Sequence, residues 1–175
     1  LKIVPSQVLT WAAWRKKFPN TEVLSTETGF RRDYSFNPYE GYDQSQSIWF
    51  AVPIHRQDFD NKDVVLGILV GKQAKAYALE RLPTDRAITD VIGDATLRIS
   101  YDPASQEPTV LNAATGEPFP FIQSFWFAWQ AFYPETDVWA PTVLELDRSL
   151  RFSLSGEKNK RYTIDISEDL RSWSP

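Results

Sequence analysis

The sequence contains no cysteine and no methionine, and His55 is its one histidine. The lack of cysteine excludes disulfide bonds, thiol nucleophiles, iron–sulfur clusters and c-type haem. A single histidine excludes a zinc or copper site built from several histidines of this chain. Because the sequence starts at Leu1 and lacks methionine, we expect it to be a processed product or a part of a longer protein.

Long apolar runs and an excess of positive charge are also lacking. The longest apolar stretches, residues 48–54 and 64–70, have the length of β-strands, whereas a membrane-spanning helix needs about 18 apolar residues or more. We therefore expect no transmembrane segment. The formal net charge of -4 argues against a nucleic-acid-binding protein, because such a protein presents a basic surface. No Gly-rich phosphate loop or metal-ligand pattern occurs, so we expect no cofactor and no metal.

The sequence does contain an internal repeat. WAAW at residues 11–14 and FPNTEV at 18–23 are followed, 115 positions later, by WFAW at 126–129 and YPETDV at 133–138. Six of the fourteen aligned positions from Trp11 onward are identical, where chance would give about one. We interpret this match as a duplication. The alternative is a pair of unrelated amphipathic helices with similar ends.

Each copy predicts a short aromatic helix, a proline stop and a strand. Trp11 and Trp14 have the spacing of one helix face, and the residue before a proline avoids the helical conformation. The second helix, expected over residues 121–133, is apolar nearly all round, which is typical of a helix in a core or at an interface. The residues that we assign to the core or an interface are Trp11, Trp14, Phe125, Trp126 and Trp129.

The segment between the repeats predicts antiparallel β-structure. Turn residues such as Gly71-Lys72 separate alternating or apolar runs, as in β-hairpins. The strands expected here are residues 64–70, 73–79, 87–91, 95–101 and 108–111, with short strands at 22–24 and 137–139 after the two helices. We expect an α+β fold of mainly antiparallel β-sheet, with two short aromatic helices in repeat-equivalent positions and a C-terminal β-hairpin.

Two parts of unequal length are expected. Residues 1–140 form the C-terminal part of a duplicated α+β domain: residues 1–24 end the first repeat, 25–63 form a long aromatic loop, and 64–140 form the second repeat. Residues 141–175 form the tail. In the tail, residues 150–154 and 162–166 alternate apolar and polar side chains, which predicts a hairpin with one solvated face.

Several stretches resemble a known family, the domain of unknown function 3179. They are TWAAW at residues 10–14, TGFRRDY at 28–34, NPYEGY at 37–42, DVVLG at 63–67, AKAY at 74–77 and FWFAW at 125–129. The resemblance extends roughly over residues 5–139. The tail is similar to short β modules that end many exported bacterial proteins.

The resemblance implies a bacterial protein exported from the cytoplasm, with no established activity. Members of the family carry an earlier repeat unit with a His-Glu segment and a Cys-containing segment. The matching stretches here, around residues 88–90 and 99–103, have neither His nor Cys. The resemblance therefore implies a degenerate C-terminal copy, whose partners are the upstream part of the same protein or other subunits.

The long loop is the candidate binding site. Loops longer than about 12–15 residues are uncommon in compact domains and often have a function. Aromatic rings can stack on a flat ligand or a sugar, and a guanidinium group can bind a carboxylate or phosphate. The candidate ligand-binding residues are Arg31, Arg32, Asp33, Tyr34, Tyr39 and Tyr42. The alternative is an ordered loop whose rings pack onto the domain and whose Asp33 pairs with a neighbouring arginine.

Other patterns give weaker evidence for a functional site. The acidic residues from Asp58 to Asp63 lack the Gly and Glu of a calcium-binding EF-hand loop and suit a solvated turn. Glu40 and Asp43 offer a carboxylate pair for acid–base catalysis. His55 offers a general base, although a structural histidine is the alternative.

Three hypotheses of function follow. The first is a non-catalytic, exported structural or binding part of a larger protein or complex. The second is a small-ligand or glycan-binding module that uses the Arg/Tyr loop. The third is a hydrolase that depends on loop carboxylates. We favour the first, and we expect no catalytic residue.

Overall fold

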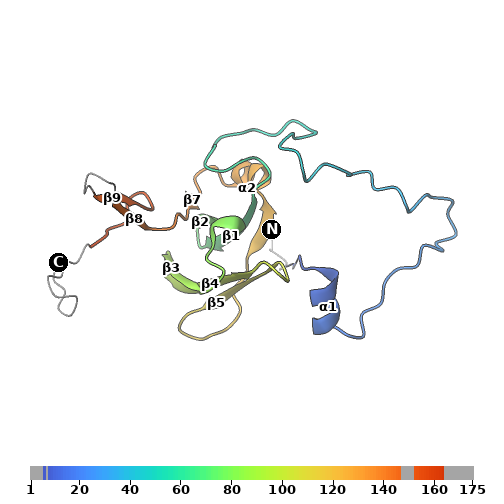
Figure 1. Ribbon diagram of the computed structural model, residues 1–175, viewed down its shortest axis with the longest axis horizontal. Coiled ribbons are helices and arrows are strands. Elements are labelled where there is room, and N and C mark those ends of the chain that lie inside the picture. The colour runs from blue at the N-terminus through green and yellow to red at the C-terminus, as the bar shows by residue number, and fades with distance from the viewer. Residues whose placement is uncertain (1–5, 7, 147–151, 164–175) are drawn as a thin grey trace. The chain divides into compact units, whose positions relative to one another are not determined.

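The computed structural model describes residues 6, 8–146 and 152–163 (Figure 1). Along the chain the elements are α1 (Trp11–Lys17), β1 (Val64–Val70), β2 (Gln73–Ala78), the 3-10 helix η1 (Leu79–Arg81), β3 (Ile88–Ile92), β4 (Ala95–Asp102), β5 (Glu107–Asn112), β6 (Ile122–Phe125), α2 (Trp126–Phe132), β7 (Asp137–Val138), β8 (Val143–Leu146) and β9 (Phe152–Ser155). They divide into two units, Leu1–Trp139 and Ala140–Pro175. All sheet pairings except β2 with β7 are antiparallel, so the α+β expectation is confirmed.

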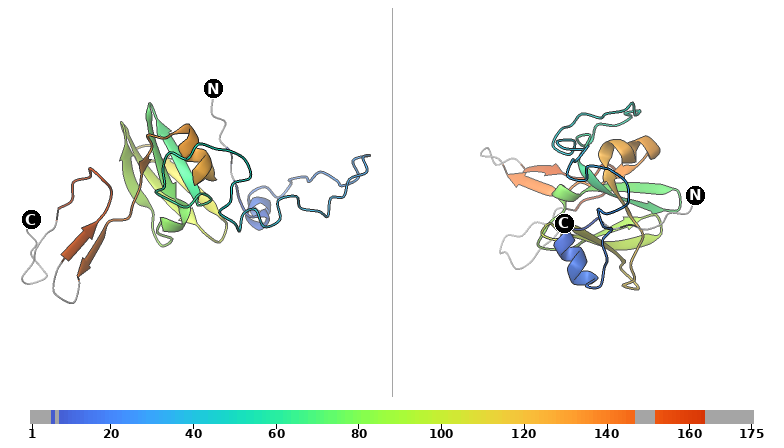
Figure 2. Two further views of the ribbon diagram at one scale, coloured as in Figure 1. Left: turned by 90° about the horizontal axis from the view of Figure 1, so that it is seen from above. Right: turned by 90° about the vertical axis from the view of Figure 1, so that its right-hand side faces the viewer.

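The first unit has three layers. A four-stranded sheet with the order β6-β1-β2-β7 lies between α2 and a three-stranded sheet with the order β3-β4-β5 (Figure 2). Leu66 and Ile68 of β1 face the three-stranded sheet, whereas Val65 of the same strand faces α2. Burial on both faces explains why β1 is apolar at every position instead of alternating.

The predicted hairpins are confirmed. β1 pairs with β2 from Val65↔Ala78 to Val70↔Gln73, around a turn in which Gly71 has a φ of +59°. A left-handed residue in a two-residue turn matches the twist of the strands it joins, and glycine adopts that conformation at the lowest cost. β3 and β4 form the second hairpin, and β5 continues the meander.

The second aromatic helix is shorter than residues 121–133. Residues 122–125 form β6 and pair with β1, with Val64 opposite Phe125, because a chain entering the helix can first complete the sheet edge. No side chain caps α2. Instead, the carbonyl oxygens of Asp63 and Asn61 accept hydrogen bonds from the amides of Trp126 and Phe127, at 2.8 and 2.9 Å, so the acidic turn before β1 satisfies the helix N-terminus.

The burial that the sequence predicted for both tryptophan pairs is found in the second copy alone. Trp126 and Trp129 are buried, at 0% and 2% exposure. Trp11 is 53% exposed, Trp14 is partly buried, and α1 has no buried residue. Trp11 is therefore not a core residue of the described structure, because α1 has no sheet beneath it among the described residues. The strand expected at residues 22–24 is likewise not formed.

The second unit contains the hairpin β8–β9, which pairs Val143 with Ser155 and Leu146 with Phe152. The expected pairing of 150–154 with 162–166 is therefore wrong: residues 152–155 pair with 143–146, which are closer along the chain. Tyr162 lies outside any strand, and its hydroxyl accepts a hydrogen bond from the Glu157 amide at 2.6 Å. Residues 164–166 lie outside the described residues.

Gly67 of β1 lies directly beneath the Trp129 ring of α2. A methyl group on Gly67 would overlap the six-membered ring of Trp129. The indole can therefore lie flat on β1 because this strand position has no side chain. The small residues Ala76 and Ala78 line the same face of β2.

We predict that Gly67→Ala lowers the free energy of unfolding by about 1–3 kcal/mol through overpacking. Trp129→Ala should lower it by about 3–5 kcal/mol through lost contacts and a cavity. Urea unfolding of both single variants and the double variant measures the coupling. In the Trp129→Ala background, alanine at position 67 should cost much less; strictly additive losses would contradict the contact.

Candidate functional site

The segment between α1 and β1 contains no helix or strand. Figure 1 shows it leaving α1, extending away from the sheets, and returning beside α2. Its local structure consists of turns, such as those closed by hydrogen bonds from the Glu40 amide to Asn37 and from the Tyr42 amide to Tyr39. The candidate binding residues from Arg31 to Tyr42 all lie in this excursion.

An aromatic cluster forms where the loop returns to the domain. Tyr42 contacts Trp49 edge-on at a ring-centroid distance of 4.6 Å, and Tyr39 stacks on the same indole at 6.1 Å. Tyr42 also contacts Phe125, the residue before α2, at 6.4 Å. The cluster therefore joins the loop to the end of β6. We call Tyr39, Tyr42 and Trp49 the loop cluster.

Lys62 anchors the loop cluster through two contacts with Tyr42. This lysine is 5% exposed, and its ammonium group lies 3.3 Å from the centroid of the Tyr42 ring. The ammonium also donates a hydrogen bond to the Tyr42 carbonyl oxygen. The Lys62 amide donates to Gln46 Oε1 at 2.8 Å. Burial of a cation requires such compensation; the sequence offered no signal for this role beyond a lysine within an acidic turn.

The last part of the loop is held by α2. The buried Gln130 side chain accepts a hydrogen bond from the His55 amide at 2.7 Å and donates one to the Pro53 carbonyl at 2.8 Å. Arg56 makes a bidentate ion pair with Asp58, at 2.7 and 2.8 Å, and donates to the Thr136 carbonyl. His55 therefore contributes its backbone to this contact, and Asp58 serves as an ion-pair partner.

The outer part of the loop is held by local contacts. The Asp33 carboxylate accepts hydrogen bonds from the Ser35 hydroxyl and amide, at 2.6 and 2.9 Å. These bonds, the hydroxyl first, lower the pKa of Asp33. Tyr34 shares a hydrogen bond with Thr28 at 2.7 Å. The ion pair between Asp33 and a neighbouring arginine, which the alternative interpretation of the loop included, is not formed among the described residues; the carboxylate is bound by Ser35 instead.

The Arg31 and Arg32 side chains are both exposed. Among the described residues, neither guanidinium group forms a hydrogen bond or ion pair, and neither contacts Tyr39 or Tyr42. Two surface pockets, of about 280 and 360 Å³, are lined by residues of other segments. The structure thus brings Tyr39 and Tyr42 together, but it does not bring the two arginines to them.

Much of the aromatic surface of the loop is exposed to solvent. Tyr39 and Trp49 are 62% and 56% exposed, although they contact each other. The other exposed aromatic residues of the loop are Phe30, Tyr34, Phe36 and Phe50. Among these exposed rings, Tyr39 and Trp49 are in contact with each other, and contiguous exposed apolar surface often marks an interaction site.

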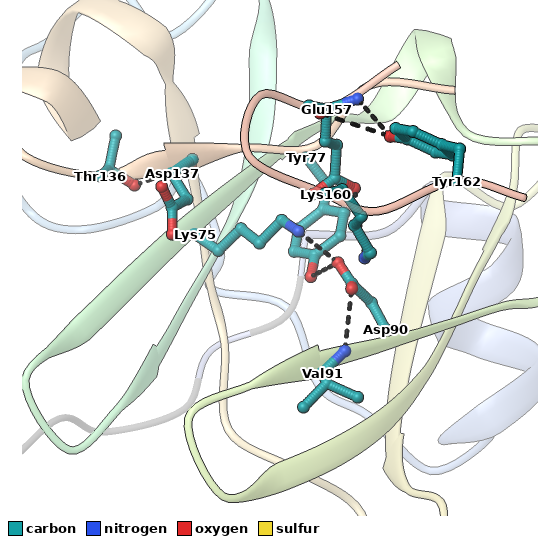
Figure 3. Close-up of polar contacts among 9 residues, drawn as sticks. All are labelled: Lys75, Tyr77, Asp90, Val91, Thr136, Asp137, Glu157, Lys160 and Tyr162. Atoms are coloured by element: carbon teal, nitrogen blue, oxygen red, sulfur yellow. Dashed lines mark hydrogen bonds and ion pairs between the residues drawn. The ribbon is translucent and has the colours of Figure 1, made fainter. Parts of the chain in front are cut away.

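A buried polar group links the two sheets of the first unit. The Asp90 carboxylate of β3 lies 2.6 Å from the Lys75 ammonium and accepts a hydrogen bond from the Tyr77 hydroxyl at 2.9 Å (Figure 3). Its other oxygen accepts a hydrogen bond from the Val91 amide at 2.8 Å. Lys75 and Tyr77 belong to β2, so these contacts cross the core. The sequence alone gives no sign of these contacts, because no local pattern pairs residues 75 and 90.

The loop carboxylates do not show the features expected of an acid–base pair. The lowered pKa of Asp33 is opposite to the raised value that a general acid requires near neutral pH. Glu40 and Asp43 make no hydrogen bond through their side chains to another described residue. In the described part of the chain, no three His, Cys, Asp or Glu residues are grouped so as to hold a metal ion. Over the same residues, no helix has the length and apolar character needed to cross a membrane.

A comparison with protein-family models shows the family to which the chain belongs. A model described as "Protein of unknown function (DUF3179)" matches residues 1–116. The chain belongs to the DUF3179 family. The match confirms the resemblance to this uncharacterised domain family; it does not extend to the tail. No curated protein and no solved structure matches this DUF3179 chain significantly.

We predict that Asp90→Ala lowers the free energy of unfolding by about 3–5 kcal/mol, because the buried Lys75 ammonium loses this carboxylate partner. Asp85 forms a 3.7 Å ion pair with Arg86 in which both side chains are largely exposed. Asp85→Ala is the matched control and should change the free energy by no more than about 0.5 kcal/mol. Equal effects of the two variants in thermal or urea unfolding would contradict a buried link.

We also predict that Ser35→Ala raises the pKa of Asp33 toward its ordinary value. A carboxyl group with a lowered pKa in the folded chain stabilises its turn above its unfolded pKa, and this contribution is lost as the pH falls through the lowered value. Carboxyl ¹³C NMR titration measures the change. Asp102, whose pKa is lowered by the Ser105 hydroxyl and the Ala104 amide, is the control. Its titration should change with Ser105→Ala and not with Ser35→Ala.

Proposed function

We propose that this DUF3179 chain is a non-catalytic structural or binding part of a larger exported protein or complex, and that the aromatic loop is its contact surface. The observation that carries the proposal is the exposure of six aromatic side chains in one loop. Aromatic residues are enriched in the centres of protein interfaces, because large rigid rings bury much area at a small entropic cost.

The attachment of the loop supports this function. Lys62, Gln130 and Arg56 hold the returning half of the loop through hydrogen bonds and ring contacts. Tyr42, whose ring contacts both Tyr39 and Trp49, is therefore positioned by the domain. A surface that is partly ordered before binding loses less conformational entropy when a partner is bound.

A second candidate is a glycan-binding or small-ligand-binding module. The stacked, exposed rings of Tyr39 and Trp49, with an interplanar angle of 18°, offer an apolar platform of the kind on which a sugar ring can lie. Arg31 or Arg32 would then bind an acidic group of the ligand. Among the described residues, neither arginine makes a hydrogen bond or a cation–π contact with the loop cluster, and this favours the protein-binding alternative.

The cellular location is part of the proposal. We propose that the chain acts outside the cytoplasm, as the resemblance to exported bacterial proteins implies. Fractionation of the source cells with an antibody to this chain tests it. Recovery in the cytoplasmic fraction alone would contradict it.

Site-specific photo-crosslinking in the source cells tests the contact surface. A benzophenone amino acid replaces Phe36 or Trp49 in the loop, and Val91, which is exposed on β3, is the control position. We predict protein adducts at positions 36 and 49 that are at least several times more abundant than at 91. Equal yields at all three positions would contradict the proposal. Binding of soluble oligosaccharides that is lost in Trp49→Ala would favour the glycan alternative instead.

A further inference from the structure

Two segments of the first unit have the same backbone structure at an offset of 115 residues. α1 and α2 have seven residues each, and both their first and last residues correspond. The residue before each helix is extended, with φ and ψ of -62° and 148° at Thr10 and -68° and 149° at Phe125. The residue after each helix adopts the same unusual conformation, -129° and 76° at Phe18 and -130° and 67° at Tyr133.

The side-chain contacts repeat as well. The Trp14 indole donates a hydrogen bond to Thr21 Oγ1 at 3.1 Å, and the Trp129 indole donates to Thr136 Oγ1 at 3.0 Å. Each of these indoles also contacts the aromatic residue four positions later, at centroid distances of 4.5 and 4.3 Å. The two segments are thus the same small structural unit. We call it the closing unit, residues 11–24 in the first copy and 126–139 in the second.

The two closing units differ in what surrounds them. In the second copy Trp126 and Trp129 are buried, and Val138 pairs with Ala76 in parallel as part of β7. In the first copy Trp11 is half-exposed, and Val23 and Leu24 are 70% and 96% exposed. The same apolar face is covered in one copy and presented to solvent in the other.

The second copy shows what covers such a face. α2 rests on a sheet face on which three contact positions are small: Gly67 on β1, and Ala76 and Ala78 on β2. The β7 strand then extends that sheet along β2. Because the first closing unit has the same indole positions and the same turn, the surface that complements it is a sheet with small residues at the same positions.

Within the described residues, the first closing unit does not bind such a sheet. The amide of Thr10 donates to the Ser105 carbonyl at 3.1 Å, and the Lys17 ammonium pairs with Glu107 at 2.6 Å. These polar contacts involve the ends of α1 and leave Trp11 exposed. The one sheet of the right kind that the described residues form already carries α2.

We propose that residues 11–24 close a second domain of the same architecture, and that their Trp11–Trp14 face binds the sheet of that domain. The sheet that this face binds is formed by a segment of the same polypeptide that is equivalent to residues 64–125. This segment precedes α1 in the sequence in the same way as β1 to β6 precede α2. The constant offset of 115 residues between the two copies is typical of a tandem repeat. This inference concerns α1 and does not depend on the aromatic loop.

The coding sequence that precedes Leu1 gives the first test. We expect a β-rich segment in it, with a glycine 115 positions before Gly67. That glycine would lie beneath Trp14 as Gly67 lies beneath Trp129. A preceding sequence that lacks such a segment, or that has a large side chain at this position, would overturn the proposal.

Hydrogen exchange of the whole natural polypeptide gives the second test. Peptides that cover residues 11–24 should be protected to within about tenfold of those that cover 126–139. In the 175-residue chain alone, the first peptides should exchange at least about 100 times faster than the second. Similar fast exchange of residues 11–24 in both proteins would overturn the proposal.

A matched pair of variants of the whole polypeptide separates docking from general loss of structure. Trp14→Ala should abolish the protection of residues 11–24 and of the preceding segment, while protection of β1 to α2 stays unchanged. Lys16→Ala changes an exposed residue of the same helix and should leave both regions protected. Loss of protection throughout the chain in Trp14→Ala, or no change anywhere, would contradict the assignment of Trp14 to the interface. Loop variants such as Trp49→Ala should affect neither region, so failure of the proposed loop function is distinguishable.

Discussion

The Trp129 indole can lie flat on β1 because residue 67 is glycine. This contact fixes the distance between α2 and the four-stranded sheet, and it directs the Nε1 group to Thr136, which begins the return to β7. α2 in turn holds the loop through Gln130 and contacts Phe50 through Phe127. The position of the helix, the edge strand and half of the loop therefore depend on one missing side chain.

The central sheet is buried on both faces, and the two faces pack in different ways. Toward α2, small residues accept large indoles. Toward the three-stranded sheet, aliphatic residues form the core, and the charge of Lys75 is compensated by Asp90. An ion pair in that position adds geometric specificity more than net stability, because desolvation offsets much of its attraction.

Local patterns predicted the strands β1 to β5 and the two hairpins that β1 to β4 form, because periodicity and turn residues act over a few positions. The boundary between β6 and α2 was mispredicted because the aromatic run 121–133 suits both structures, and pairing with Val64 decided the outcome. Lys62, Arg56 and Asp90 were missed as anchors since each acts through a contact with a residue distant in sequence. The burial of Trp11 was mispredicted for the opposite reason: the repeat specifies the helix itself, but not whether a sheet lies beneath it.

The chain thus contains one closing unit whose tryptophans are buried against a sheet and one whose Trp11 is exposed to solvent. It also contains an aromatic loop with exposed rings. ¹⁹F NMR of the chain labelled with 5-fluorotryptophan tests this contrast directly, through the change in chemical shift between H₂O and D₂O. The account predicts a negligible solvent shift for Trp126 and Trp129, and a large one for Trp11 and Trp49. Resonances are assigned by single Trp→Phe substitutions. Equal protection of Trp11 and Trp129 in the 175-residue chain would contradict the account.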